Sequence, residues 1–490
     1  MRKSILILLV ILLPAIIFAQ GITTSAISGK VVDQSGSPMP GVNVVAVHDA
    51  SGSKYGTVSR EDGNYNVTNI RPGGPYTLKV SMVGYSEQSR AGIYADLGQN
   101  VKLNFTLSEG AVEVGEVVVT GQANPILSAD RMGAAAIVNT KQMEAIPTLT
   151  RNFEDYYKLS PFMSGSNAAG RNSKYNNIQI DGANYNDIFG LGGTTPGSQS
   201  RATPISLDAI EQFQIEISPY DVRKGGFTGS GINAVTRSGT NKFTGSAFIY
   251  SRNEGNVGES VNLTDSLKKP YAAFTDNMMG FRIGGPIIEN QLYFFANAEV
   301  SRNTTPLDRV FGATTQSTNQ FTLSKDSLEQ VKNILKNKYG YEAGEYLTMD
   351  NVLNSDKWFA RIDWNLSDDH RLSIRHNFLG ADYDNSPSLG RGSNHIFYTN
   401  QRYTVKNSTN STALNLNSVF GNNIANEFIF GYTVQEDRPM YYGEAFPSVR
   451  IDTKAADGKV YLILAGAEHF RHRNELDQKV PLFDLIHFYV

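Results

Sequence analysis

The distribution of hydrophobic residues strongly limits how this chain can enter a membrane. A single long apolar run extends from Ile5 to Phe18, follows Arg2 and Lys3, and is broken only by Pro14. No later segment holds 18 consecutive apolar residues, whereas about 20 are needed for a helix to cross the hydrocarbon core. Because backbone polar groups must be paired inside a bilayer, the mature chain could span a membrane only as a β-barrel.

The first residues predict export from the cytoplasm. The basic start, the apolar run and the small residue Ala19 before Gln20 form the pattern of a cleaved signal peptide over residues 1–19. A membrane anchor is the alternative, but the run is shorter than a membrane span and Pro14 would disrupt its helix.

Composition narrows the possible chemistry. The 490 residues are 40% hydrophobic with a formal net charge of −3, which argues against a disordered chain and against a nucleic-acid binder. The absence of Cys excludes disulfide scaffolds, thiolate zinc sites and Cys nucleophiles. The 45 Gly, 24 Tyr and 25 Phe favour a mainly β fold with many turns.

Residues 26–108 alternate short β-branched runs with turn signals. Asp62-Gly63, Pro40-Gly41 and Pro72-Gly73 separate runs such as 42–47 and 76–80. This spacing predicts a small β-sandwich. The pattern resembles the carboxypeptidase regulatory-like domain that precedes many outer-membrane receptors.

The segment 112–121, with the sequence VEVGEVVVTG, is a β-branched run bounded by Gly115 and Gly121. It is either a last strand of the sandwich or an unpaired strand available for β-augmentation by a partner. It resembles a TonB box. That resemblance implies binding to a TonB-type energy-coupling protein of the inner membrane through Glu116, Val117, Val118, Val119 and Thr120.

Three ordered motifs lie within residues 122–241: NNIQIDG at 176–182, LDAIEQFQIE at 207–216 and GSGINAVTRSGTN at 229–241. Together they resemble the α+β plug domain of TonB-dependent outer-membrane transporters. The sequence ISPY at 217–220 replaces the Arg-Gly pair of many plugs, so no salt bridge of that Arg is carried over. The variant is similar to the Oar-like branch. The plug motif residues are Asp181, Gly182, Gly231, Asn233, Thr236, Arg237 and Gly239.

From residue 242 the pattern changes to long alternating strands. Trp358, Ile362 and Trp364 fall on one face of such a strand, and Lys357 and Arg361 fall on the other, with Phe359 as an exception among the polar residues. This is the alternation of a strand with one face toward lipid and one toward a lumen. The same test predicts strands at 242–252, 277–287, 291–302, 357–366, 370–380, about 400–420 and 424–436.

Connections between these strands alternate in length. Short ones are expected at 288–290, 367–369 and 421–423, and the longest at 303–356, as in outer-membrane barrels with short periplasmic turns. A soluble β-sandwich is the weaker alternative. Because a plugged lumen belongs to a barrel of about 22 strands, we expect residues 242–490 to hold only part of a barrel, as in a fragment or a truncated product.

The resemblance implies energy-coupled import of a ligand that the sequence does not identify, without a cofactor. The resemblance also implies that the protein is not an enzyme, and the absence of a G-x-S-x-G elbow argues against an acyl hydrolase. We expect no metal site either: the nearest candidate, His469 with His472, is interpreted as part of a solvated loop. An adhesion or assembly protein anchored in outer-membrane lipid is the main alternative function. A signalling receptor is a second, although its usual helical signalling domain does not fit the all-β N-terminal module.

Overall fold

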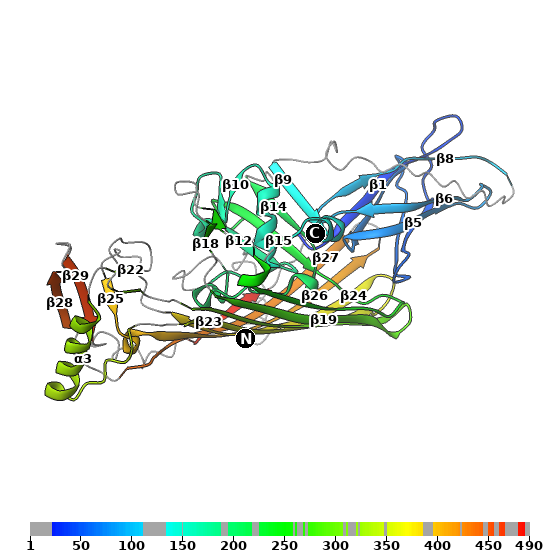
Figure 1. Cartoon of the computed structure of the whole chain (residues 1–490). Helices are drawn as coiled ribbons and strands as arrows, with labels where there is room; N and C mark the ends of the chain where they lie inside the picture. Colours follow the sequence, from blue (N-terminus) through cyan, green and yellow to red (C-terminus); the bar gives the residue numbers. More distant parts are fainter. Residues whose placement is uncertain are drawn as a thin grey trace, which may run out of the picture.

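The structure is a computed structural model. It describes residues 22–110, 134–148, 150–187, 195–217, 225–257, 260–261, 268–269, 273–306, 310–311, 320–321, 324–346, 350–385, 395–421, 424–443, 449–454, 460–465 and 479–485. The described chain is mainly β, as predicted, and forms three units (Figure 1). None of its described helices is long and apolar enough to cross a membrane.

The N-terminal unit is a β-sandwich, here called the sandwich (residues 22–110). One sheet contains β1 (Ser25–Asp33), β4 (Asn64–Ile70), β7 (Asn100–Lys102) and β8 (Phe105–Leu107). The other has the order β3 (Lys54–Val58), β2 (Asn43–His48), β5 (Gly73–Ser81), β6 (Gln88–Ala95). Alternating residues of both sheets, such as Val44, Tyr65 and Leu78, form a core that contains sandwich residues only.

The second unit, here called the central domain, spans residues 134–236. Its sheet has the order β13 (Ala183–Asn184), β12 (Asn177–Ile180), β15 (Ser230–Thr236), β14 (Ile210–Ile217), β9 (Ala134–Asn139). Strands β12 and β15 are parallel. The domain also contains α2 (Thr140–Ala145), η3 (Phe153–Leu159), β10 (Met163–Ser164), β11 (Asn167–Ala168), η4 (Ser173–Tyr175), η5 (Ser198–Ser200) and η6 (Leu207–Ala209).

The third unit is an antiparallel sheet of eight strands in sequence order, here called the large sheet. Its strands are β16 (Thr244–Asn253), β19 (Thr275–Ile288), β20 (Leu292–Pro306), β23 (Asp350–Asn365), β24 (His370–Asn385), β26 (Tyr403–Phe420), β27 (Ile424–Tyr441) and β30 (Lys479–Leu485). All seven predicted strands are present, several of them longer than expected, and β30 was not predicted. Within the described residues β16 and β30 are open edges, so the barrel is incomplete.

The two faces of the large sheet differ as the alternation predicts. Ile362, Trp364 and Ile374 are 42–47% exposed on the outer face, which suits contact with lipid. The inner face carries the central domain. Phe359, the exception in the pattern, is buried there: together with Phe295 it belongs to the core of the central domain. Its apolar ring faces inward because a packed domain, and not water, covers that position.

The two ends of the large sheet carry different connections. The short turns lie beside the sandwich, and the long connections lie at the opposite end, where Figure 1 shows α3 (Lys325–Tyr339). That end also carries η7 (Glu254–Asn256), β17 (Ser260–Val261), β18 (Lys268–Lys269), β21 (Val310–Phe311), β22 (Gln320–Phe321), β25 (His395–Phe397), η9 (Thr399–Gln401), β28 (Val449–Lys454) and β29 (Val460–Ala465). Helix α3 was not predicted, although Ser324 caps its start and Gly340, in the left-handed conformation, ends it.

Candidate functional site

The candidate site is built on the tight turn between β12 and β13. Asp181 and Gly182 are its two central residues, with φ values of 47° and 77°. Two positive φ values define a turn that favours Asp-Gly, because Asp tolerates the left-handed region and Gly has no Cβ to oppose it. The turn therefore presents the Asp181 side chain at the edge of the central domain.

The Asp181 carboxylate is first held within its own domain. Its Oδ1 accepts a hydrogen bond from the Thr236 backbone N at 2.9 Å, and its Oδ2 accepts one from the Thr236 hydroxyl at 2.8 Å. Thr236 is the last residue of β15, the parallel neighbour of β12. Two residues of the predicted motif set, 55 positions apart, thus form one buried unit.

Two arginines of the large sheet complete the site. Arg361 on β23 donates to Asp181 Oδ1 at 3.2 Å and to the Thr236 hydroxyl at 2.8 Å. Its Nη2 donates to Asp363 at 2.7 Å. Arg375 on β24 lies with its Nε 2.9 Å from Asp181 Oδ2 as an ion pair, although that angle is not one of a hydrogen bond, and its Nη2 donates to the Ile180 carbonyl at 2.7 Å.

Three of the four charges lie almost out of water. The side chains of Asp181, Arg361 and Arg375 are 8%, 11% and 3% exposed. Breaking a buried ion pair by removing one partner costs about 3–5 kcal/mol, because the other charge stays desolvated. Since the carboxylate comes from the central domain and both cations come from the large sheet, this cluster fixes the one unit to the other.

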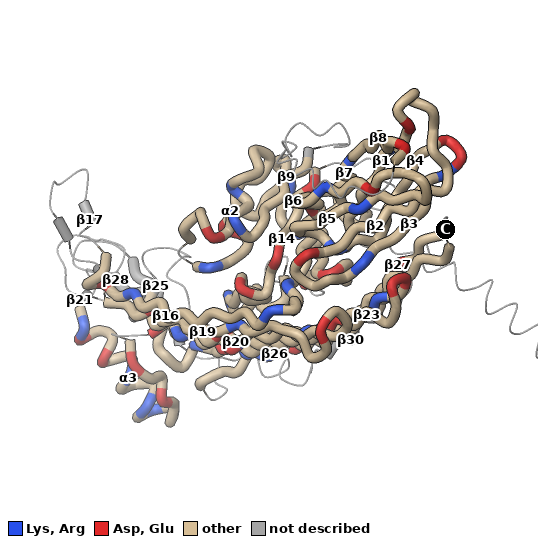
Figure 2. The backbone as a smooth tube through the Cα atoms, turned by 90° about the vertical axis from the view of Figure 1, so that its right-hand side faces the viewer, with Lys and Arg blue, Asp and Glu red and all other residues tan. Residues whose placement is uncertain are grey.

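A buried ion pair within the large sheet provides a second polar attachment for the central domain. Lys357 Nζ donates to Glu299 Oε1 at 2.6 Å, and both side chains are at most 3% exposed. The central domain bonds to each of them: the Ser206 hydroxyl donates to Glu299 Oε2 at 2.7 Å, and Lys357 Nζ donates to the Thr203 hydroxyl. In the view of Figure 2, basic and acidic segments lie close together where the central domain meets the large sheet.

The other predicted motif residues serve separate contacts. The backbone of Gly239 packs directly on the large sheet: a Cβ at this position would lie 2.4 Å from the Phe294 carbonyl oxygen, which is too close for any side chain. Arg237 donates from Nε to the Ile210 carbonyl at 3.1 Å, and burial lowers the pKa of its guanidinium. Asn233 on β15 donates to the Ile22 carbonyl of the sandwich. A Cβ at Gly231 would meet the ring of Phe227.

Sequence reasoning missed Arg361, Arg375, Glu299 and Lys357 as partners of the central domain. The available signal was a charged residue on the inner face of an alternating strand, which does not indicate its partner. Glu116 to Thr120 and the pair His469–His472 lie outside the described residues. Among the residues that the structure describes, no group of three or more His, Asp and Glu could hold a metal ion.

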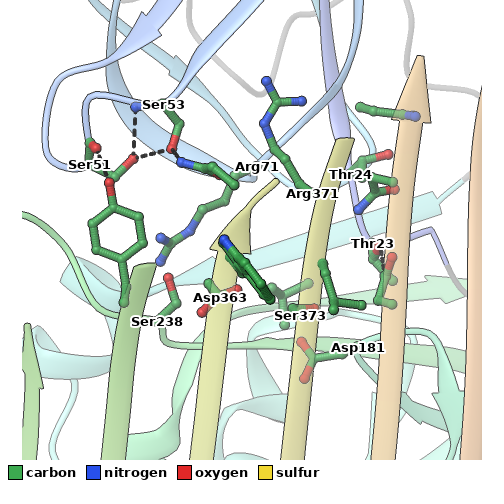
Figure 3. Close-up of a pocket in the computed structure, with 18 of the residues that line it drawn as sticks. Thr23, Thr24, Ser51, Ser53, Arg71, Asp181, Ser238, Asp363, Arg371 and Ser373 are labelled. Carbon is green, nitrogen blue, oxygen red and sulfur yellow. Dashed lines mark hydrogen bonds between the residues drawn. The ribbon is translucent and has the colours of Figure 1, made fainter. Parts of the chain in front are cut away.

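A polar cavity of about 80 Å³ opens beside the cluster, between all three units (Figure 3). Ser51, Ser53 and Arg71 of the sandwich line it from one side, and Asp181 and Asp363 from the other. Its size admits a few water molecules, and its polar lining could bind them. The cavity is therefore a polar space between the three units that is large enough for water.

Two families match this chain. The carboxypeptidase regulatory-like domain family matches residues 26–108, and the outer membrane beta barrel domain family matches residues 235–343 and 327–451. These two matches cover the sandwich and most of the large sheet.

Two curated proteins are similar in sequence. TonB-dependent transporter Oar of Myxococcus xanthus is 29% identical over 305 residues, which are 57% of this chain and 26% of Oar. TonB-dependent receptor P39 of Formosa agariphila is 31% identical over 121 residues, which are 25% of this chain and 10% of P39. The chain thus spans only about a quarter or less of the length of these relatives.

Solved structures give weaker matches. The outer membrane transporter YddB of Escherichia coli has 12% identity and a TM-score of 0.45, covering 67% of this chain and 42% of YddB. The siderophore receptor PirA of Pseudomonas aeruginosa has 13% identity and a TM-score of 0.40, covering 64% of this chain and 42% of PirA.

The sequence relatives and the two domain families agree with each other and with the mainly β fold. The barrel family and the relatives indicate the outer membrane as the location. The chain is thus a homologue of TonB-dependent outer-membrane proteins such as Oar and P39, with an N-terminal carboxypeptidase regulatory-like domain and an outer-membrane β-barrel domain that is incomplete in the described residues.

Proposed function

We propose that this chain is part of an outer-membrane transporter that imports a ligand when a TonB-type protein rearranges the central domain, which acts as the plug. The observation that carries this proposal is the buried contact of Asp181 with Arg361 and Arg375. It attaches a compact domain to the inner face of a barrel sheet through a few discrete polar bonds. Such bonds can break and re-form without unfolding either unit.

The coupling segment 112–121 lies between the sandwich and the central domain in the chain. A force applied there acts on residue 110 at one end and on residue 134, the first residue of β9, at the other. Strand β9 is an edge strand of the central sheet, paired only with β14 within the described residues. Because an edge strand has one row of hydrogen bonds, it is the easiest point at which to pull the plug out of shape.

The remaining assignments complete this proposal. Residues 1–19 serve as the cleaved signal peptide, residues 122–241 form the plug, and residues 242–490 belong to the barrel whose outer face meets lipid. Glu116 to Thr120 add a strand to the partner, with main-chain bonds giving affinity. The protein itself needs no cofactor and catalyses no reaction, and the ligand remains to be identified.

The test uses binding to the partner, because the ligand is unidentified. The periplasmic domain of the host's TonB protein is titrated with the full-length protein, with Val118→Pro and with Val118→Ala. Pro removes a backbone donor and blocks strand pairing, so Val118→Pro should weaken binding by at least about tenfold. Val118→Ala keeps the backbone intact and should stay within about twofold of the unchanged protein.

Equal affinity of all three proteins would contradict the proposal. A deletion of residues 112–121 with unchanged cellular function would contradict it as well, because an anchored adhesion protein does not need the coupling segment. Loss of binding in both Val118 variants would assign affinity to the side chain, and would refute pairing through the backbone.

A further inference from the structure

We infer that the sandwich is a releasable cap on the short-turn end of the large sheet, and that force on the coupling segment removes it before the plug moves. The short-turn end is defined by the connections at 289–291, 366–369 and 421–423 with the strand residues beside them. Release by force rests on the proposed transport function, whereas the docked position of the sandwich does not. Figures 1 and 2 both place the sandwich against this end.

The sandwich contacts the first two short turns with one edge. The Tyr293 hydroxyl donates to the Ser51 carbonyl, and Asn365 Nδ2 donates to the Ser53 hydroxyl at 2.9 Å (Figure 3). The next residue, Lys54, accepts a hydrogen bond at its carbonyl from Arg371. A short loop of the sandwich, residues 51–54, thus follows the rim of the large sheet across two hairpins.

Arg371 provides the most specific contact. Its guanidinium lies over the ring of Tyr55 at 3.9 Å, a distance suited to a cation–π interaction. Tyr55 is itself part of the sandwich core, so the cation rests on a rigid ring. The contact recognises a folded sandwich and would not form with an unfolded chain.

The third short turn is contacted by two other parts of the sandwich. Asn69 Nδ2 donates to the Asn426 carbonyl at 3.3 Å. The Thr23 hydroxyl bonds to Glu427, and it accepts a hydrogen bond from Asn415 Nδ2 at 3.1 Å. All three hairpins of the described sheet are therefore covered by one domain.

The chemistry of this interface favours separation. The sandwich core contains only residues 27–107, while the core of the central domain includes Phe295 and Phe359 of the large sheet. Undocking the sandwich therefore exposes no core of its own, whereas moving the central domain uncovers aromatic surface. Inter-domain interfaces that are polar and not strongly apolar allow relative motion by default.

Cavities along the junction support the same conclusion. Two of about 80 Å³ and one of about 320 Å³ lie between the sandwich and its neighbours. The largest of the three is lined by Arg71 of the sandwich, Glu211 of the central domain, Arg237 just after that domain, and Arg282 of the large sheet. A charged junction with cavities large enough for water leaves fewer direct contacts between the units, so opening it breaks fewer of them.

The order of the chain then gives the order of events. The coupling segment follows the sandwich directly, so tension reaches both the sandwich and β9. The sandwich is held by hydrogen bonds and by two cation–π contacts, Arg371 over Tyr55 and Lys141 over Tyr94. The central domain is held by the buried ionic cluster of Asp181 and by an apolar core that it shares with the large sheet. The weaker attachment yields first, and its release uncovers the short-turn end beneath the plug.

The absence of Cys allows a direct test with single introduced thiols in the full-length protein. Ser53→Cys places a thiol in the interface, where Ser53 is 8% exposed, and Val83→Cys places a control thiol on the sandwich at a position that is 99% exposed. Labelling rates with N-ethylmaleimide are compared in energised cells, in cells treated with a protonophore, and in a deletion of residues 112–121.

The cap predicts that the labelling rate of Ser53→Cys, relative to Val83→Cys, falls at least about tenfold when the gradient or the coupling segment is removed. Adding Arg371→Gln to Ser53→Cys should restore fast labelling without the gradient, because this change weakens the contact between the sandwich and the large sheet. Equal relative rates in all three conditions would overturn release by force.

Docking is tested separately from release. The variant with both Ser53→Cys and Asn365→Cys should be joined by a short bismaleimide reagent in purified protein, and a variant with Ser53→Cys and Val83→Cys should not. Failure of the first pair to react, with both thiols accessible to a monofunctional reagent, would overturn the docked arrangement. Efficient joining together with gradient-independent labelling would overturn release while leaving the partner-binding test of the transporter unaffected.

Discussion

Replacing Asp181 by Asn tests whether the buried ionic cluster holds the central domain on the large sheet. Asn keeps the size of the side chain and one oxygen that can accept from Thr236, but it removes the charge. Arg375, 3% exposed, then has only the Ile180 carbonyl as a hydrogen-bond acceptor and no carboxylate. Arg361 keeps Asp363 at 2.7 Å. The change therefore leaves one uncompensated buried cation.

The expected magnitude follows from that single orphaned charge. Breaking a buried pair costs about 3–5 kcal/mol, and the remaining Asp363 places this case at the lower end, about 3 kcal/mol. An energy of about 3 kcal/mol is roughly a 100-fold change in an equilibrium constant. The opening of the central domain away from the large sheet should thus become about 100-fold more populated.

Amide hydrogen exchange of the detergent-solubilised full-length protein measures this opening. Amides of β12 and β15 should exchange about 100-fold faster in Asp181→Asn, while those of β2 and β5 in the sandwich stay unchanged as an internal reference. Asp363→Asn is the matched control: Asp363 is 20% exposed and its loss leaves Asp181 with both arginines, so the effect should be clearly smaller.

A double variant distinguishes the cost of leaving Arg375 without a carboxylate from the cost of changing the shape of the Asp181 side chain. Adding Arg375→Gln to Asp181→Asn removes the uncompensated cation, so exchange at β12 and β15 should return part of the way toward the unchanged protein. Unchanged exchange in Asp181→Asn, or a double variant that exchanges faster than the single one, would refute the assignment of this cluster as the attachment of the central domain.

Two further predictions concern other parts of the chain. Gly239→Ala would place a Cβ 2.4 Å from the Phe294 carbonyl oxygen and 2.6 Å from that of Gly285, so the yield of folded protein in outer membranes should fall sharply. Gly56→Ala, the control, has open space around its Cβ and should fold normally. Equal yields of the two variants on heat-modifiability gels would contradict this packing. Burial, aided by Arg71, lowers the pKa of His48 from its ordinary 6.5 to about 3. Below pH 6.5 His48 is therefore protonated in the unfolded chain but stays neutral in the folded sandwich. The free energy of unfolding should decrease as the pH falls from about 6.5 toward 3, by up to about 1.4 kcal/mol per pH unit. Melting curves of the full-length protein should lose this slope in His48→Gln, and an identical slope would refute it.

The architecture was predictable because its signals are local. The Asp-Gly pair at 181–182 forms the turn that its residues favour, and the alternation along 357–366 separates the two faces of β23. Phe359 could not be placed, since it joins the core of the central domain, whose residues between 138 and 234 the strand pattern does not contain. Helix α3 was missed inside a long connection where strands were the expected element, despite its caps at Ser324 and Gly340.

The site was only half predictable. Asp181 and Thr236 were named from motifs, but their partner Arg361 lies 180 positions from Asp181 in the sequence. The alternation in a single sequence predicts that Arg361 and Arg375 lie on the inner face of the sheet, but it does not identify the residues that they contact. Pairing of this kind depends on how the central domain is seated on the large sheet, which is a property of the whole fold.

The distribution of partners within the cluster determines what separation costs. When the central domain leaves the large sheet, Asp181 keeps both hydrogen bonds from Thr236, and Arg361 keeps Asp363. Arg361 loses Asp181 and Thr236 but retains this one carboxylate, whereas Arg375 loses its carboxylate and the Ile180 carbonyl together. Water that reaches the interface can hydrate that guanidinium, so the largest penalty falls on one residue of the large sheet, while Asp181 retains the hydrogen bonds of its own domain. An attachment of this kind is strong while water is excluded and weakens once solvent reaches it, which suits the plug role proposed above for the central domain.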